Sequence, residues 1–348
     1  MTLAPRVVLV HRRTEYEELL AHHGTPGQAA FFLDSRGRSV AEVEHRHHRQ
    51  AEALARAAAA VPLDWRRTRV ERADLPRFLF EPEDVVVVVG QDGLVANVAK
   101  YLDGQPVIGV DADPGRNPGV LVRHRADALP ALLPAAVARS GSRHLEERTM
   151  VEAVADDTQR LLALNEVYVG QPGHQTARYR LTVTGAGGAS ADAPPLSAES
   201  SAPRGLPGPR GSAGLQGSAG LQGSAASRGS AAPQASGEPQ ASSGVLVGTG
   251  TGATGWCRSA WLERGGPLAL PEAAAPALAW FVREAWPSPV TGTSRVHGVL
   301  DAGRQLVLTV ESDRLVAFGD GIETDALELT WGQSIRLGVA ATRLRLLG

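Results

Sequence analysis

A short acidic turn, Gly90-Gln91-Asp92-Gly93, separates a run of five valines from a segment with helical character. In an open parallel sheet, ligands bind beyond the carboxyl ends of the strands. A carboxylate held there can face a nucleotide hydroxyl, and the free N–H groups of the following helix can bind phosphate. We therefore expect Asp92 beside a reacting hydroxyl, and Gly90, Gln91 and Gly93 beside phosphate. An ordinary strand-to-helix turn is the alternative interpretation.

Two adjacent polar residues, Asn165 and Glu166, interrupt an apolar run over residues 161–169. Polar groups in a buried strand need hydrogen-bond partners. A carboxamide and a carboxylate side by side can hold ribose hydroxyls and the edge of a purine. The pair therefore predicts a substrate-binding position, unless partners within the protein satisfy both side chains.

Glycine and threonine alternate over much of residues 247–255, and Trp256 follows directly. Glycines let a ligand approach the backbone closely, and threonines add hydroxyls. The spacing differs from that of a Walker A phosphate loop. We expect Thr249, Thr251 and Gly252 to contact a ligand and Trp256 to stack on a base. A flexible glycine-rich turn is the alternative.

Three histidines, His45, His47 and His48, lie close to Glu44 in one segment. Only one His–Glu pair at a time has the spacing that places both residues on one face of a helix. The sequence contains neither a CxxC nor an HExxH pattern. We therefore predict a solvated helix face and no dedicated metal site in the protein. The single cysteine, Cys257, is expected to be a small buried hydrophobic residue.

The first part of the chain, residues 1–141, alternates between strand-like and helix-like segments. A helix is predicted at 39–60, where Ser39 and Glu42 could form a capping box, and another at 94–102. β-branched runs suit central strands that are buried on both faces. This order of elements predicts a Rossmann-like α/β domain. The predicted strands cover residues 6–10, 65–70, 85–89 and 106–110.

The second part, residues 142–348, is rich in strand-like segments and predicts a β-rich domain. Residues 185–244 interrupt it with a sequence dominated by Gly, Ala, Ser and Pro. The apolar content of this stretch is too low to offset the entropy of ordering the chain, so we predict a disordered insertion. The predicted strands cover residues 148–155, 160–169, 178–184, 296–300, 305–310, 315–318 and 335–339.

The whole chain has 348 residues, a formal net charge of -2 and 43% hydrophobic residues. That apolar share suits a globular core, and a nearly balanced charge gives no strong attraction to nucleic acid or anionic membranes. The first residues lack the apolar core of a signal peptide, and no apolar run is long enough to span a bilayer. One cysteine fits a reducing compartment. We expect a cytoplasmic protein with neither a nucleic-acid nor a membrane partner.

In this order, the turn at 90–93, the pair at 165–166 and the segment at 247–256 resemble motifs of the NAD kinases, most closely the mitochondrial-type NAD kinases. The likeness covers nearly the whole chain outside the insertion. It implies the NAD kinase/diacylglycerol kinase-like fold, with the nucleotide between an α/β and a β-rich domain, and assembly as a homo-oligomer. Further matches lie at residues 13–17, 44–48, 106–114, 242–244, 282–284 and 320–321.

The resemblance implies an ATP-dependent kinase that uses Mg²⁺ and phosphorylates the 2′-hydroxyl of the adenosine ribose of NAD to give NADP. In this reading Asp92 is the general base or orients the hydroxyl, and Asn165 and Glu166 hold the adenosine half of NAD. The other implied contacts are Thr249, Thr251, Gly252 and Trp256 to the nucleotide, and Arg283 to phosphate.

Three positions depart from the family pattern. Gln91 replaces the second glycine of the acidic turn, Leu94 replaces a threonine after it, and Ala253 replaces a serine. A positive φ at position 91 would strain a glutamine. Two alternatives therefore stay open: a non-catalytic nucleotide-binding protein of the same fold, and a kinase of that fold with a different acceptor, such as a nucleoside or a lipid diol.

Overall fold

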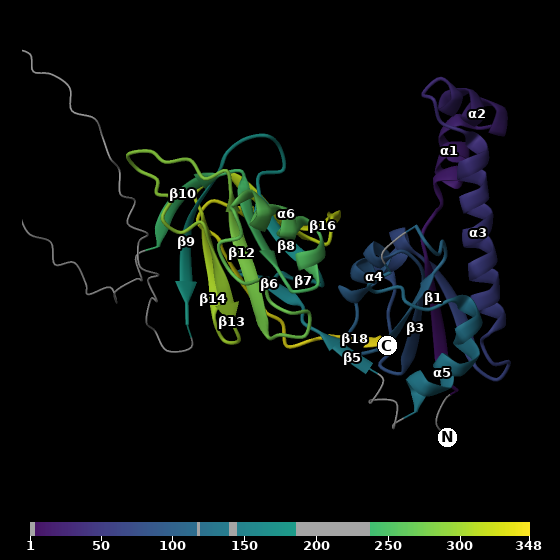
Figure 1. The fold of residues 1–348 in the computed structure, drawn as a ribbon. Helices are drawn as coiled ribbons and strands as arrows, with labels where there is room; N and C mark the ends of the chain where they lie inside the picture. The colour runs from purple at the N-terminus through teal and green to yellow at the C-terminus, as the bar shows by residue number, and fades with distance from the viewer. Residues whose placement is uncertain (1–3, 117–118, 139–144, 186–236) are drawn as a thin grey trace, which may run out of the picture.

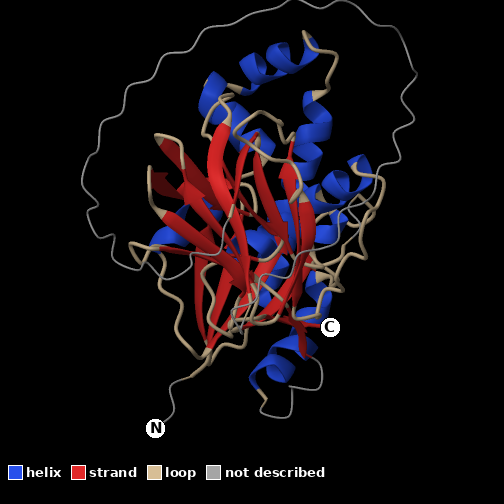
Figure 2. Cartoon of the chain, turned by 90° about the vertical axis from the view of Figure 1, so that its left-hand side faces the viewer, coloured by secondary structure: helices blue, strands red, loops and turns tan. Residues whose placement is uncertain are grey.

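The computed structural model describes residues 4–116, 119–138, 145–185 and 237–348. These residues form a mixed α/β structure with three six-stranded β-sheets. One sheet is mainly parallel and is flanked by helices (Figure 1). The other two are antiparallel and share one hydrophobic core. Figure 2 shows the strands in red.

The mainly parallel sheet has the strand order β2-β1-β3-β4-β18-β5. The first four of these strands are confirmed close to their predicted bounds. The last two come from residues that we assigned to the second domain, 142–348, so the predicted domain boundary cuts through this sheet. The strands are β2 (Arg66–Glu71), β1 (Arg6–His11), β3 (Asp84–Gly90), β4 (Pro106–Asp111), β18 (Leu344–Leu347) and β5 (Leu145–Arg148).

The valine run explains why β3 lies in the middle of this sheet. Every residue of β3 is buried. Side chains alternate between the two faces of a strand. Val86 and Val88 therefore pack with one group of helical residues, and Val85, Val87 and Val89 pack with another. A strand that is apolar on both faces needs helices on both sides, as in parallel sheets generally.

The helices cover the two faces of this sheet and also form an arm. Helices α1 and α2 pack on the outer end of the long helix α3, which projects beyond the sheet (Figure 1). Ser39 precedes α3, but its side chain makes no capping hydrogen bond, so the predicted capping box with Glu42 is absent. The helices are α1 (Glu15–His23), α2 (Pro26–Asp34), α3 (Val40–Ala59), α4 (Asp92–Ala99) and α5 (Leu129–Val137), with short 3-10 turns η1 (Arg72–Arg77) and η2 (Ala126–Ala128).

The remaining two sheets form a β-sandwich. One has the order β10-β9-β14-β17-β6-β7 and the other β13-β12-β11-β8-β15-β16. Their strands are β6 (Val151–Ala155), β7 (Arg160–Ala163), β8 (Glu166–Gly170), β9 (Ala177–Thr184), β10 (Glu238–Ser242), β11 (Gly244–Gly248), β12 (Ala277–Arg283), β13 (His297–Asp301), β14 (Gln305–Val310), β15 (Arg314–Gly319), β16 (Ile322–Thr330) and β17 (Ser334–Val339).

A short helix covers the outer face of the second sandwich sheet. It is α6 (Trp256–Glu263), preceded by the 3-10 turn η4 (Gly252–Thr254). Cys257 on α6 packs against Leu246 and Phe281 and is fully buried, as predicted. Among the described residues, no helix combines the length and apolar character needed to cross a membrane.

Two predicted segments differ from the structure in ways that matter for the site. The strand predicted at 160–169 is broken into β7 and β8, which belong to different sheets, so Glu166 begins a strand at the rim of the sandwich. The insertion predicted at 185–244 reaches too far, because Glu238–Ser242 forms β10, paired with β9. The polar side chains of β10 find hydrogen-bond partners in the sandwich; for example, Ser242 Oγ lies 2.7 Å from Tyr179 Oη. Residues 186–236 lie outside the described part of the chain.

Candidate functional site

The carboxylate of Asp92 lies at the first turn of α4 and is fully engaged by the backbone. Its Oδ2 accepts a hydrogen bond from the amide of Val120 at 2.9 Å. Its Oδ1 accepts two more, from Leu121 at 2.7 Å and from Val122 at 2.9 Å. Asp92 therefore fastens the turn after β3 to the segment that follows β4.

Gln91 fits the turn without backbone strain. It precedes α4 in an extended conformation, with φ -120° and ψ 164°. The strain that a positive φ would have imposed on a glutamine is therefore absent. Leu94, the second departure from the family pattern, is buried in α4 and packs against the core of the parallel sheet.

A small pocket of about 120 Å³ gathers most of the predicted site residues. It lies between the start of α4 and the loop that leads into α6. Three separate sequence motifs thus meet at one place in the fold. The predicted residues that line it are Asp92, Gly93, Asn165, Glu166, Thr251, Gly252 and Trp256, and the remaining lining residues are Val120, Leu121, Thr254 and Gly255.

Glu166 brings a carboxylate without a hydrogen-bond partner into this small pocket. Among the described residues, its side chain makes neither a hydrogen bond nor an ion pair. Burial raises the pKa of Glu166 to about 8, and the nearby negative charge of Asp320 adds to the shift. The group therefore holds a proton at neutral pH that it can release at mildly alkaline pH.

Asp320 fixes the backbone on which Glu166 stands. It has a positive φ of 53°, a conformation that Asp tolerates better than most residues. Its carboxylate accepts hydrogen bonds from the amides of Leu164 at 2.8 Å, Asn165 at 2.7 Å and Glu166 at 3.4 Å. Burial raises the pKa of Asp320 to about 6, although these amides and Lys100 oppose the shift. The link between β7 and β8 is thus held by a second carboxylate in the same manner as the 120–122 segment.

The two threonines of the glycine–threonine loop have different environments. Thr249 is fully buried, donates to the carbonyl oxygen of Leu164 at 2.5 Å and accepts the amides of Thr251 and Gly252. Thr249 therefore holds the loop in place, and it does not line the small pocket. Thr251 is 3% exposed, and its hydroxyl has no hydrogen-bond partner among the described residues. Because Thr251 lines the small pocket, a ligand there could satisfy it.

Arg283 lies behind Trp256 and does not line the small pocket. Trp256 stacks on Tyr168, with ring centroids 5.4 Å apart. The guanidinium of Arg283 lies 5.3 Å from the ring centroid of Trp256 and forms an ion pair of 3.2 Å with Glu284. This packing orients the tryptophan at the edge of the small pocket. The predicted phosphate contact of Arg283 would need a ligand that reaches past Trp256.

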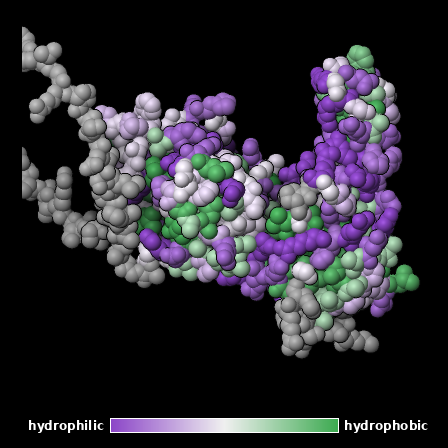
Figure 3. All heavy atoms as spheres, in the orientation of Figure 1, coloured by the Kyte–Doolittle hydropathy of each residue, from purple (hydrophilic) through white to green (hydrophobic). Residues whose placement is uncertain are grey.

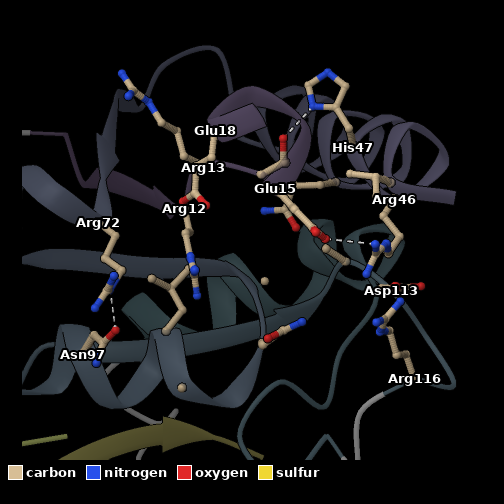
Figure 4. Close-up of a pocket in the computed structure, with 18 of the residues that line it drawn as sticks. Arg12, Arg13, Glu15, Glu18, Arg46, His47, Arg72, Asn97, Asp113 and Arg116 are labelled. Carbon is tan, nitrogen blue, oxygen red and sulfur yellow. Dashed lines mark hydrogen bonds and ion pairs between the residues drawn. The ribbon is translucent and has the colours of Figure 1, made fainter. Parts of the chain in front are cut away.

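A larger pocket of about 450 Å³ lies on the other side of the acidic turn, between the helical arm and the body of the molecule. The space-filling view shows a hollow between these parts, with hydrophilic residues along the arm (Figure 3). The pocket is rich in basic side chains, with Arg12, Arg72 and Asn97 at one end and Arg46, Asp113 and Arg116 at the other (Figure 4). Its basic lining residues are Arg12, Arg13, Arg46, Arg72, Arg116 and His47, and its acidic ones are Glu15, Glu18, Asp113 and Asp320.

Several of these basic groups are available to an anion. Arg46 pairs with Glu15 at 3.0 Å, and Arg72 donates to Asn97 at 2.7 Å. The side chains of Arg12, Arg13 and Arg116, in contrast, make no hydrogen bond or ion pair with any other described residue. Their charges can therefore be neutralised by a bound anion.

Sequence reasoning placed only part of the large pocket. It pointed to Gly90, Gln91 and Gly93, which all line it. It treated the histidine-rich face of α3 as solvated, whereas His47 lines the pocket and lies 2.9 Å from Thr14 Oγ1. The segments 13–17 and 44–48, which the sequence offered only as points of resemblance, contribute to this wall.

The two pockets share a wall at the acidic turn. Gly93 lines both, Gln91 lines the large pocket and Asp92 lines the small one. The described residues assemble no group of three or more metal-ligating side chains.

A scan of protein-family models gave no match to this chain, and a search of curated proteins found no similar sequence either.

Proposed function

We propose that this protein is an ATP-dependent NAD kinase, which phosphorylates the 2′-hydroxyl of the adenosine ribose of NAD and yields NADP. The observation that carries the proposal is the shared wall: an arginine-lined pocket and a carboxylate-lined pocket meet at Gly93. Phosphoryl transfer depends mainly on positioning and on charge neutralisation, so it needs these two sites side by side. The Rossmann-like sheet and the β-rich sandwich support the NAD kinase/diacylglycerol kinase-like fold as part of this proposal.

The large pocket suits the phosphoryl donor. A triphosphate carries several negative charges, and arginine binds phosphate through a rigid fork of N–H donors. The unpaired side chains of Arg12, Arg13 and Arg116 supply that charge. The start of α4, with Gly93 at the second helical position, adds backbone N–H groups at the boundary between the pockets. The terminal phosphate of ATP would lie at this boundary, with Mg²⁺ bound to the phosphates.

The small pocket suits the acceptor hydroxyl. Asn165, Glu166 and Thr251 offer it an amide, a carboxyl and a hydroxyl group. These groups match the hydroxyls of a ribose in hydrogen-bonding capacity. Gly252 belongs to this wall for a steric reason, because a Cβ there would lie 2.3 Å from the carbonyl oxygen of Asn165. The loop can therefore approach the Asn165–Glu166 link only with glycine at this position.

The test is direct. Purified protein incubated with Mg-ATP and NAD should give NADP, detected by mass spectrometry, with inorganic polyphosphate tested as a second donor. Arg12→Gln should raise the KM for ATP and leave the KM for NAD nearly unchanged, because Arg12 lines only the large pocket. Arg314→Gln, at an exposed position of β15, is the control and should change neither constant. Folded protein that forms no NADP with either donor would remove the proposal.

A second candidate function is a kinase with a smaller acceptor. The observation in its favour is volume: ligand pockets for whole drug-sized molecules hold about 300–1,000 Å³, whereas the small pocket holds about 120 Å³. A dinucleotide must therefore extend beyond it or widen it. Incubation with labelled ATP and a set of nucleosides and diols separates the two: transfer to one of these in preference to NAD would favour this alternative.

A further inference from the structure

Two carboxylates face the small pocket, and their surroundings differ. Both oxygens of Asp92 already accept backbone hydrogen bonds, three in all, from residues 120–122. Taking up a proton would weaken these bonds, because a neutral carboxyl group is a poorer acceptor than a carboxylate. Glu166 has neither a hydrogen bond nor an ion pair with any described residue, yet it lines the same pocket.

We infer that Glu166 is the catalytic residue that accepts the proton of the acceptor hydroxyl, and that Asp92 is a positioning residue that holds the pocket wall. This inference rests on the proposed kinase function. In the step, the acceptor oxygen attacks the terminal phosphorus of the donor and a new O–P bond forms. The bond between that phosphorus and the leaving nucleoside diphosphate breaks, and the hydroxyl proton moves to a carboxylate oxygen of Glu166.

The fold keeps Glu166 in this pocket. The break between β7 and β8 places Glu166 at the first position of β8, where Asp320 binds the amides on both sides of the link. Burial, with the charge of Asp320, raises the pKa of Glu166 to about 8. A base works best when its pKa lies near the working pH. A carboxyl group with an ordinary pKa would bind the hydroxyl proton far more weakly.

The charged groups around Glu166 come from three elements. Asp320 approaches from the turn between β15 and β16 and opposes ionisation of Glu166. Asp92 faces the same pocket from α4. Cys257 on α6 is held neutral, because burial and the charge of Glu166 raise its pKa to about 12. The positive charge of Lys100 opposes the rise in the pKa of Asp320, and Lys100 forms its ion pair with Asp325 at 2.8 Å.

The distinguishing measurement is kcat/KM for NAD as a function of pH, from about pH 6.5 to 9.5 with saturating Mg-ATP. Glu166 is protonated below its pKa of about 8, so the active base form is lost as pH falls. We expect kcat/KM to rise about tenfold per pH unit below pH 8 and to level off above it. Asp92→Asn should lower the rate but keep this rise.

Glu166→Gln should lower kcat by roughly 10²- to 10⁴-fold and abolish the rise with pH. Glu323→Gln, at an exposed position of β16, is the matched control and should behave as wild type. Thermal melts at pH 9 show whether the Glu166→Gln variant is folded. The substitution removes a charge that wild type must bury at that pH, so the variant should melt no lower than wild type.

Three outcomes overturn the inference. NADP formation that is independent of pH over this range removes Glu166 as the base and leaves the kinase function intact. A Glu166→Gln variant with activity within tenfold of wild type also removes Glu166 as the base and leaves the kinase function intact. No NADP from wild type at any pH removes the kinase function, and the role of Glu166 with it.

Discussion

At the scale of single residues, Thr249 and Thr251 form a natural pair for comparison. They lie two positions apart in one loop and are both buried. The hydroxyl of Thr249 makes three hydrogen bonds within the protein, whereas that of Thr251 makes none with the described residues. A buried hydroxyl without a partner costs free energy, so its presence points to a role outside the folded protein itself.

Thr251→Val should therefore leave the free energy of unfolding unchanged or slightly increased. It should raise the KM for NAD by about 2- to 10-fold, because one neutral hydrogen bond is worth about 0.5–1.5 kcal/mol. Urea unfolding and steady-state kinetics check the two parts.

Thr249→Val is the matched control. It removes a donor and an acceptor that the loop uses, so unfolding should become easier by about 1–3 kcal/mol. If the two variants lose equal stability, the hydroxyl of Thr251 has a partner in the protein and its proposed role in the acceptor site fails.

Residue types predicted the small pocket better than the large one. The motifs with Asp92, Glu166 and Thr251 meet, because strand ends and glycine-rich loops restrict where such side chains can lie. Sequence could not separate Thr249 from Thr251, since only the folded loop shows which hydroxyl is satisfied. Nor could it single out Arg12, because an arginine becomes part of a pocket wall only through the position of its neighbours.

At the scale of elements, the start of α4 contains two positions, 91 and 93, at which glycine has different effects. Gln91 is extended, and Gly93 lies within the helix with open space around the position of a Cβ. The parallel strand β3 and helix α4 were both predicted, as were most sandwich strands, because their apolar patterns are regular. The polar strand β10 and the break at Asn165 were missed, because side-chain partners across sheets decide them.

Gln91→Gly should lower the free energy of unfolding by about 0.5–1 kcal/mol, since glycine adds freedom to the unfolded chain and relieves no strain here. It should not increase kcat.

Gly93→Ala should raise the free energy of unfolding and lower activity, because its methyl group lies where both pockets meet. Thermal melts and kinetics on the two variants provide the check; a gain in kcat for Gln91→Gly would favour a glutamine that impairs catalysis.

At the scale of the whole molecule, an ion pair with a buried lysine joins the parallel sheet layer to the sandwich. The side chain of Lys100, the residue directly after α4, is 2% exposed, and its Nζ lies 2.8 Å from the carboxylate of Asp325 on β16. Tyr101 donates to the same carboxylate at 2.7 Å. Asn97, on the same helix, donates to the backbone carbonyl of Asp320. Helix α4 therefore carries the first turn of the site at one end and the contact between the two layers at the other.

Lys100→Met should destabilise the protein by about 1–3 kcal/mol, because it leaves the partly buried carboxylate of Asp325 without its cation. The double variant with Asp325→Asn should recover part of that loss. The exposed pair of Arg314 and Glu328 is the control, and Arg314→Met should change stability by less than about 1 kcal/mol. Urea unfolding measures all three; equal losses for the two pairs would mean that Lys100 does not join the layers.

The position of β18 has a consequence for how this molecule forms. Leu344–Leu347 lie between β4 and β5, yet they follow Asp111 by more than two hundred residues along the chain. Until those residues are synthesised and reach their place, β4 keeps an unpaired edge that can recruit other chains. Contacts between such distant parts of a sequence also slow folding. A fragment ending near residue 141 should therefore be prone to aggregation, and nascent chains should depend on chaperones until synthesis has passed β18.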